Sequence, residues 1–361
     1  MRLSPFSSRF RELVSGRRKG LGPSLLRAGL GLAEVPYSWA VRRRNLRYDR
    51  GQAAIHRVPV PVISVGNLTL GGTGKTPLVR WITQWLLDRG LSVAIISRGY
   101  GARQGSENDE ALELRADLPQ VGQVQNPDRV AAAREAIERF GSQAIVLDDA
   151  FQHRRLARDL DLVLLDACEP FGFQHVFPRG TLREPVDGLG RADVVLLSRA
   201  DMVDAEVRQS LRRQVARYAP AAAWGEVVHA PLALVSRQGV EEPLASLAGG
   251  RIAAFAGIGN PAGFRHTLES CGYPPVAFWE FADHHAYTPD DLASLAARAA
   301  QLGAAAVVCT RKDLVKLDAE RLGDVPLRAL KIGLEFLRGQ EILEQRLAAI
   351  LSPSPAGRGP G

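Results

Sequence analysis

The stretch VGNLTLGGTGKTP, residues 65–77, constrains the fold of this chain more than any other feature. It ends in GKT, as phosphate-binding loops do, but Thr69 stands where the usual G-x-x-x-x-G-K-[ST] pattern has its first glycine. The apolar run at 60–65 predicts a buried strand before the loop, and residues 76–89 carry apolar side chains at helical spacing. Because strand, glycine loop and helix are the context that the motif requires, we predict a nucleotide site despite the irregular loop.

The loop residues have the chemistry that a bound phosphate needs. Its glycines let the backbone approach the phosphates closely, and the N-terminus of the following helix adds partial positive charge. Lys75 can reach the outer phosphates of a nucleotide, and the Thr76 hydroxyl can bind Mg²⁺. The residues predicted to bind the nucleotide are Thr69, Leu70, Gly71, Gly72, Thr73, Gly74, Lys75 and Thr76.

Short apolar runs alternate with helical patterns along the rest of the chain. Strands are expected at 93–97, 144–150, 160–167, 193–201, 251–259, 276–281, 304–310 and 327–336, and helices at 127–140, 204–217, 261–272 and 289–302. This alternation predicts an α/β fold, a doubly wound parallel sheet of the P-loop NTPase type with a second, smaller α/β domain. The expected division is a basic N-terminal segment at 1–50, a P-loop core at 51–229, a C-terminal α/β domain at 230–350 that closes over the site, and a disordered tail at 351–361, with the inter-domain link near 230–249.

The charge of the chain is concentrated at its N-terminus. Residues 1–50 hold 12 Lys/Arg and 3 Asp/Glu, a balance of +9, whereas the remaining residues hold 34 and 36, a balance of −2. Local basicity of this kind argues against a nucleic-acid partner. The three cysteines are far apart and form no C-x-x-C pair, which favours a reducing cytoplasm and argues against zinc.

Residues 22–51 mix apolar side chains with a cationic end. Arg27, Glu34 and Pro36 interrupt the apolar stretch, so it falls short of the ~18 uninterrupted residues expected of a membrane-spanning helix. Two interpretations remain open from the sequence. A basic, aromatic-bearing amphipathic segment can lie on an anionic membrane surface, or a helix can pack on the domain with a solvated basic face.

Polar clusters follow several of the predicted strands, where ligands bind in open α/β sheets. Asp148 and Asp149 end an apolar run and are candidates for holding Mg²⁺, as an acidic residue at this position does in P-loop proteins. In FPRGTLREP, Arg183 is a candidate for neutralising the transferring phosphate and Glu184 for sharing the metal, although a surface ion pair is the plainer interpretation. The stretch ADHHAYT at 282–288 indicates proton transfer or metal ligation.

These motifs occur in an order that resembles one enzyme family. VGNLTLGGTGKTP, SRGYG, LDDAFQHRRLARDLDLVLLDA, FPRGTLREP, AFAGIGNPAGF, FADHHAYT and RKDLVKL together resemble the tetraacyldisaccharide 4′-kinases, the lipid A kinases of Gram-negative bacteria. The resemblance runs from about residue 35 to residue 340, and the loop with Thr69 is itself a trait of that family. One departure is Ala150, which stands where the family usually has glycine in DDGFQH.

The resemblance implies a reaction and a location. ATP would donate its γ-phosphate, with Mg²⁺, to the 4′-hydroxyl of an acylated glucosamine disaccharide 1-phosphate, giving lipid IVA. The enzyme would work at the cytoplasmic face of the bacterial inner membrane, as a peripheral or monotopic protein. The family's acid–base pair matches Asp109 and His284 here, although Asn108 and Ala111 replace the glycine and proline that usually flank the aspartate.

Two other functions are compatible with a phosphate loop. A P-loop GTPase is suggested by SRAD at 198–201, which follows a strand but lacks the Asn-Lys part of the guanine-reading motif. A nucleotide-gated assembly ATPase would use the second domain as a partner surface. ATP and GTP turnover, each with and without the acylated disaccharide, separates these functions from the kinase.

Overall fold

The computed structural model describes residues 8–99, 109–283 and 285–352, and its centre is a 13-stranded sheet. Along the sheet the strands follow the order β10-β9-β11-β13-β7-β6-β5-β1-β4-β2-β3, while β12 pairs with β13 and β8 with β7. The strand bounds are β1 Val62–Asn67, β2 Val93–Ser97, β3 Gly122–Gln125, β4 Ala144–Asp148, β5 Leu160–Asp166, β6 Val194–Ser198, β7 Ala223–Val235, β8 Glu241–Glu242, β9 Ile252–Ala256, β10 Ala277–Glu280, β11 Ala306–Thr310, β12 Arg321–Leu322 and β13 Val325–Arg338.

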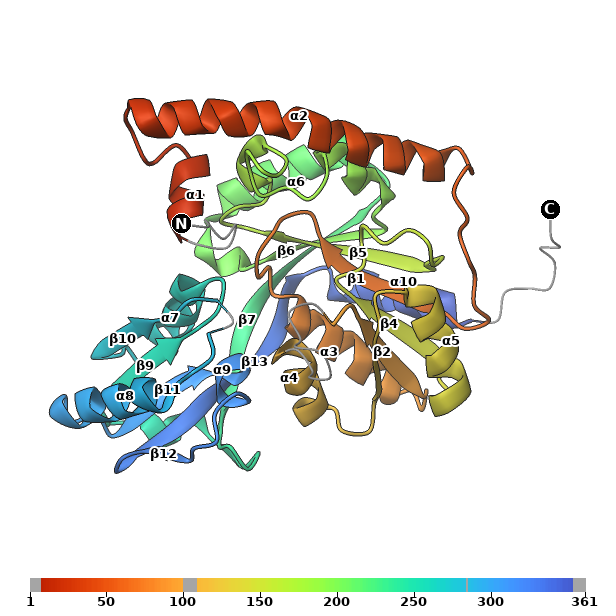
Figure 1. Ribbon diagram of the computed structural model, residues 1–361. Helices are drawn as coiled ribbons and strands as arrows, with labels where there is room; N and C mark the ends of the chain where they lie inside the picture. Colours follow the sequence, from red (N-terminus) through yellow and green to blue (C-terminus); the bar gives the residue numbers. More distant parts are fainter. Residues whose placement is uncertain (1–7, 100–108, 284, 353–361) are drawn as a thin grey trace.

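Helices cover both faces of this sheet, as the sequence predicts for a doubly wound α/β fold (Figure 1). Their bounds are α1 Ser8–Val14, α2 Leu21–Asp49, α3 Lys75–Leu87, α4 Asp109–Asp117, α5 Arg129–Phe140, α6 Ala205–Tyr218, α7 Pro261–Ser270, α8 Pro289–Gln301, α9 Arg311–Leu314 and α10 Gln340–Leu351. In the first half of the sheet, β1 to β6, helix α3 packs on one face and α5 on the other. In the second half, which contains β9 to β12, helix α8 packs on one face and helix α7 on the other.

The two halves of the sheet are joined by the long strands β7 and β13. These strands run antiparallel to each other, whereas β6 pairs with β7 in parallel and β11 with β13 in parallel. Both strands pass from one half into the other (Figure 1). The sheet is therefore continuous across the region where the sequence predicts a link between domains.

The expected boundary between residues 229 and 230 falls inside β7, so the predicted link near 230–249 is wrong for its first residues. This strand could not be predicted because Pro231 lies within it, and proline within an apolar run argues against a strand. The ladder between β7 and β13 accommodates the proline at an irregularity, since the register shifts between Lys331 and Ile332, where Ile332 faces Pro231.

Helix α10 also crosses the expected division. It lies in the range assigned to the C-terminal domain, yet Leu343 and Leu347 are fully buried in the hydrophobic core of the first half, together with Ile63, Ile82 and Leu162. The chain thus returns to the first half of the sheet after the strands of the second half. The predicted tail lies outside the described residues from 353 onward.

The N-terminal helices lie on the outside of the first half. Helix α2 runs along the top of the molecule in Figure 1, with α1 beneath its N-terminal end. None of the helices in the described residues is long and apolar enough to cross a membrane. Helix α2 has 29 residues, but Val41 is the single buried residue assigned to it, so its attachment depends on the polar contacts described below.

Candidate active site

The phosphate loop connects β1 to α3, and its shape explains why threonine replaces the first glycine. Left-handed backbone occurs at Gly71 (φ 120°) and at Gly74 (φ 83°), the residue that caps α3, but not at Thr69. Thr69 is buried and forms an isolated bridge with Leu182, and the next amide, Leu70 N, donates to Thr181 O at 2.7 Å. The loop is therefore held by the segment 181–182, and a Cβ at position 69 meets no conformational obstacle.

Three charged side chains meet beside this loop. Arg183 Nη1 donates to both carboxylate oxygens of Asp149 at 2.8 Å, and Lys75 Nζ lies 3.4 Å from Asp149 Oδ1. Burial would raise the pKa of the Asp149 carboxyl, but the two neighbouring cations outweigh it and hold that pKa well below its usual value. Asp149 has a left-handed backbone (φ 52°), which an L-residue adopts at a cost.

The donors near the loop suit a magnesium ion. Asp148 ends β4 and lies beside Val65, just before the loop, because the register pairs these two residues. Asp148 and Thr76 are 2% and 6% exposed and offer a carboxylate and a hydroxyl oxygen. Mg²⁺ takes hard oxygen ligands and typically uses one or two carboxylates plus phosphate oxygens, so this donor set fits it.

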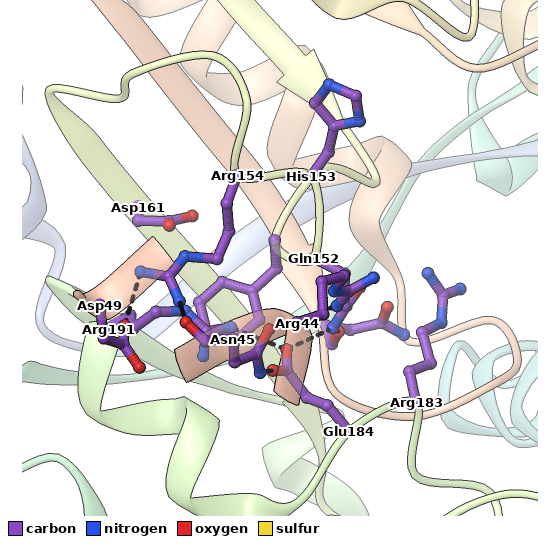
Figure 2. Close-up of polar contacts among 12 residues, drawn as sticks. Arg44, Asn45, Asp49, Gln152, His153, Arg154, Asp161, Arg183, Glu184 and Arg191 are labelled. Carbon is purple, nitrogen blue, oxygen red and sulfur yellow. Dashed lines mark hydrogen bonds and ion pairs between the residues drawn. The ribbon is translucent and has the colours of Figure 1, made fainter. Parts of the chain in front are cut away.

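Glu184 does not belong to this donor set. Its carboxylate is fully buried and accepts hydrogen bonds from Asn45 Nδ2 at 2.7 Å, Gln152 Nε2 at 3.1 Å and Arg191 Nη2 at 2.8 Å. Figure 2 shows that the adjacent side chains of Arg183 and Glu184 point to different groups. Glu184, predicted as a metal ligand, thus takes part in the attachment of α2, and its partner Asn45, 139 residues away, could not be predicted from the sequence.

A cavity of about 500 Å³ opens over the loop, between the two halves of the sheet. The loop, Asp149 and Arg183 line one side, and segments that follow β9, β10 and β11 line the other, with Asn260, Asp283 and Arg311 among them. The cations in its wall are Lys75, Arg98, Arg183, Arg199, Arg311 and Lys312, against the acids Glu113, Asp149 and Asp283. An excess of positive charge in a concave wall suits a polyphosphate ligand.

Several residues of the cavity wall were not predicted as site residues, and two of them, Arg199 and His229, contact the phosphate loop. Arg199 has a left-handed backbone (φ 54°), pairs with Asp166 and donates from Nη2 to Gly72 O at 2.7 Å, so it braces the phosphate loop. His229, on β7, lies against Gly74, and burial together with the charge of Arg199 lowers its pKa to about 3. Arg199 directly follows β6 and His229 lies on β7, both distant in sequence from the loop, so their contacts with the loop could not be predicted from local motifs.

Comparisons with known proteins agree with this site. The family model described as tetraacyldisaccharide-1-P 4′-kinase matches residues 26–352. The chain belongs to the tetraacyldisaccharide 4′-kinase family. A tetraacyldisaccharide 4′-kinase of Anaeromyxobacter sp. (strain K) is 42% identical over 95% of this chain and 97% of its own, and one of Chlorobium luteolum is 37% identical over 88% and 96%. The crystal structure of "apo" form LpxK from Aquifex aeolicus in complex with ATP is 28% identical, has a TM-score of 0.71 and covers 90% of this chain and 99% of its own.

Membership of the tetraacyldisaccharide 4′-kinase family agrees with how the structure uses SRAD, the stretch that suggested a GTPase. Arg199 braces the phosphate loop, and Asp201 Oδ2 lies 3.2 Å from His266 Nε2 on α7. Both side chains therefore have structural partners within the chain. The similarity to a guanine-reading motif has no counterpart in the contacts of these residues.

The acid–base pair that the kinase family implies lies outside the described side chains. His284 and the side chain of Asp109, the first residue of α4, are not described. Their described neighbours Glu113 and Asp283 both line the cavity. Arg311 Nη2, on α9 of the second half, lies 2.8 Å from Asp117 Oδ1, so an ion pair joins the second half to the end of the helix that Asp109 begins.

Proposed function

We propose that this chain transfers the γ-phosphate of ATP to the 4′-hydroxyl of tetraacyldisaccharide 1-phosphate, giving lipid IVA, a step in lipid A biosynthesis. The observation that carries this function is the cationic cavity over the phosphate loop, in a chain that belongs to the 4′-kinase family across residues 26–352. ATP is the expected donor because the solved relative is a complex with ATP. Lys75 and the loop amides would bind the phosphates, and Arg183 would offset charge on the transferring group.

The ion pairs that Asp149 makes with Lys75 and Arg183 must be exchanged for contacts with the phosphates before catalysis. Lys75 and Arg183 face its carboxylate, so an incoming triphosphate competes with Asp149 for the same two cations. With Lys75 paired to a phosphate, the Asp149 carboxylate, Asp148 and Thr76 would offer oxygen ligands to Mg²⁺, which would supply positive charge against that of the phosphates.

The acceptor hydroxyl must lose a proton as the phosphoryl group is transferred. We assign this step to Asp109, oriented by His284, as the resemblance to the kinase family implies. Asp109 begins α4, His284 follows β10 in the sequence, and the Arg311–Asp117 ion pair joins α4 to α9 of the second half. Proton removal would therefore depend on closure of the cavity, which limits hydrolysis of ATP by water.

The acceptor is an acylated lipid, and α2 has the surface to meet it in a membrane. Leu21, Leu25, Leu32, Val35, Trp39 and Leu46 are all exposed, and their spacing of three, four or seven residues places them on one face. The opposite face carries Glu34, Val41 and Asn45, which contact the body of the protein. An outward apolar face flanked by arginines favours the membrane-surface interpretation of this segment over a helix with a solvated basic face. We therefore place the enzyme at the cytoplasmic face of the inner membrane.

Nucleotide turnover with and without acceptor tests this function. We expect ATP consumption to depend on Mg²⁺ and on the acylated disaccharide 1-phosphate, with GTP a poor substitute. A GTPase would prefer GTP without any acceptor, and an assembly ATPase would turn over ATP at the same rate whether or not the acceptor is present. Either result contradicts the kinase function.

A further inference from the structure

A second pocket, of about 310 Å³, lies at the C-terminal end of α2, apart from the residues of the nucleotide cavity. Its wall combines the last turns of α2, the segment that leads from α2 to β1, and one residue of the loop after β4. The lining residues are Arg44, Arg47, Tyr48, Gln52, Ala53, Ala54, His56 and Arg155. Three arginines and one histidine thus line one concavity, and none of the residues that line it is acidic.

Little negative charge within the chain balances these cations. The Arg155 Nη1 to Asp128 Oδ2 distance is 3.7 Å, and both side chains are nearly half exposed, so this ion pair is weak. Arg44 Nη2 donates to the neutral Asn45 Oδ1 at 3.4 Å. Arg47 makes no side-chain hydrogen bond or ion pair to any of the residues that the structure describes. Bringing like charges together costs free energy that a bound anion recovers.

The pocket is also firmly built. Arg154, next to Arg155, lies 2.7 Å from Asp49 Oδ1 and donates to Asn45 O at 3.1 Å, which fixes the loop after β4 to the end of α2 (Figure 2). His56 N donates to Arg155 O at 2.7 Å, and Gln52 N donates to Arg47 O at 2.7 Å. The three wall segments are therefore held in place without a ligand.

The position of the pocket indicates which anion it takes. Arg43 stacks over Trp39 of the outward apolar face at 5.3 Å, and Arg47, one helical turn further along α2, follows Leu46, the last residue of that face. An anion that sits at the boundary of an apolar surface is a lipid headgroup, and guanidinium groups match phosphate oxygens in geometry. We infer that this pocket binds the phosphate of an anionic membrane phospholipid and so fixes the orientation of α2 on the membrane; the inference rests on the membrane location proposed above.

Vesicle sedimentation with the full chain tests the site. The triple variant R44Q/R47Q/R155Q is compared with wild type on phosphatidylcholine vesicles and on vesicles that also contain phosphatidylglycerol. One cation near an anionic surface changes partitioning about fivefold, so we expect the triple variant to lose on the order of 100-fold on anionic vesicles and little on neutral ones. The matched control R251Q/R298Q/R346Q removes the same charge from exposed positions outside the pocket and should lose less than about twofold.

The outcomes separate the pocket from the membrane location. Equal binding of wild type and triple variant to anionic vesicles, or an equal loss in the control, overturns the pocket but leaves the location intact. Wild type that binds neither kind of vesicle overturns both.

Turnover of detergent-dispersed acceptor, without phospholipid, should be unchanged in the triple variant, and a raised KM for the acceptor would instead assign the pocket to the acceptor's own phosphate. Competition by inorganic phosphate at matched ionic strength would assign it to a free anion. If the triple variant fails to fold, R47Q alone is used, because Arg47 has no internal side-chain partner among the described residues.

Discussion

Arg183 Nη1 donates to both carboxylate oxygens of Asp149 at 2.8 Å, which ties the loop after β4 to the segment that braces the phosphate loop. Lys75 shares the same carboxylate. Asp149 therefore pairs with both of the cations that we propose for phosphate binding. Lys75 and Arg183 repel each other, and the Asp149 carboxylate between them offsets that repulsion.

This arrangement predicts a pH dependence of stability. Because the two cations depress the folded-state pKa of Asp149, its ionised form stabilises the fold above the unfolded-state pKa of about 3.9, and this contribution is lost as pH falls toward the lower folded value. The difference in urea midpoint between wild type and Asp149→Asn, measured without nucleotide, should be constant from pH 5 to 8 and shrink below about pH 4. A difference that grows on acidification would contradict the depressed pKa.

Glu184 and Asp148 should respond differently to substitution. Glu184→Gln leaves Asn45 and Arg191 imperfectly paired around a buried group, so it should lower the free energy of unfolding by about 1–3 kcal/mol. The Mg²⁺ concentration for half-maximal activity should stay unchanged. Asp148→Asn should raise that concentration on the order of tenfold or more. Thermal melts and Mg²⁺ titrations of both variants measure these two effects. A large increase in the Mg²⁺ concentration that Glu184→Gln needs for half-maximal activity would identify Glu184 as a metal ligand.

The chemistry of the phosphate loop was predictable because it lies in consecutive residues whose types and spacing follow from the ligand. Arg199 and His229 were not predictable, since the sheet brings them to the loop from β6 and β7. The full length of strand β7 was not predicted, because Pro231 within it argues against a strand. The irregular register between β7 and β13 accommodates this proline. The sequence left the orientation of α2 open, because a helical pattern does not say which face a neighbour covers. Asn45, Glu34 and Tyr37 settle it through contacts with the body of the protein.

The outward face of α2 should control attachment to lipid. Leu32 and Trp39 are 78% and 61% exposed, so Leu32→Asp with Trp39→Asp should leave the melting temperature nearly unchanged. Partitioning onto vesicles should fall by about tenfold or more, because two large apolar side chains no longer enter the interface. Leu232→Asp with Ile342→Asp, two exposed apolar residues on β7 and α10, is the matched control and should partition normally. Equal behaviour of the two pairs would remove α2 from membrane attachment.

Asp109 and His284 should act as one unit in proton transfer. Asp109→Ala and His284→Ala should each lower kcat by roughly 10²-fold or more, the usual scale of general acid–base help. The double variant should be little worse than the worse single variant, since groups that share one task lose activity non-additively. The KM for ATP should change less. Additive, modest effects in variants with normal melting temperatures would remove the pair from the mechanism.

Transfer of a phosphoryl group from ATP to the 4′-hydroxyl of the lipid can be measured by following the γ-phosphate. With γ-labelled ATP, Mg²⁺ and tetraacyldisaccharide 1-phosphate, the label should appear on the 4′-oxygen of the lipid product, identified by mass spectrometry. Lys75→Ala should retain less than about a tenth of this transfer at saturating ATP, a loss of more than ~1.4 kcal/mol in transition-state stabilisation. Label released as inorganic phosphate with or without the lipid, or a Lys75→Ala variant that keeps more than a tenth of the transfer, would contradict the account.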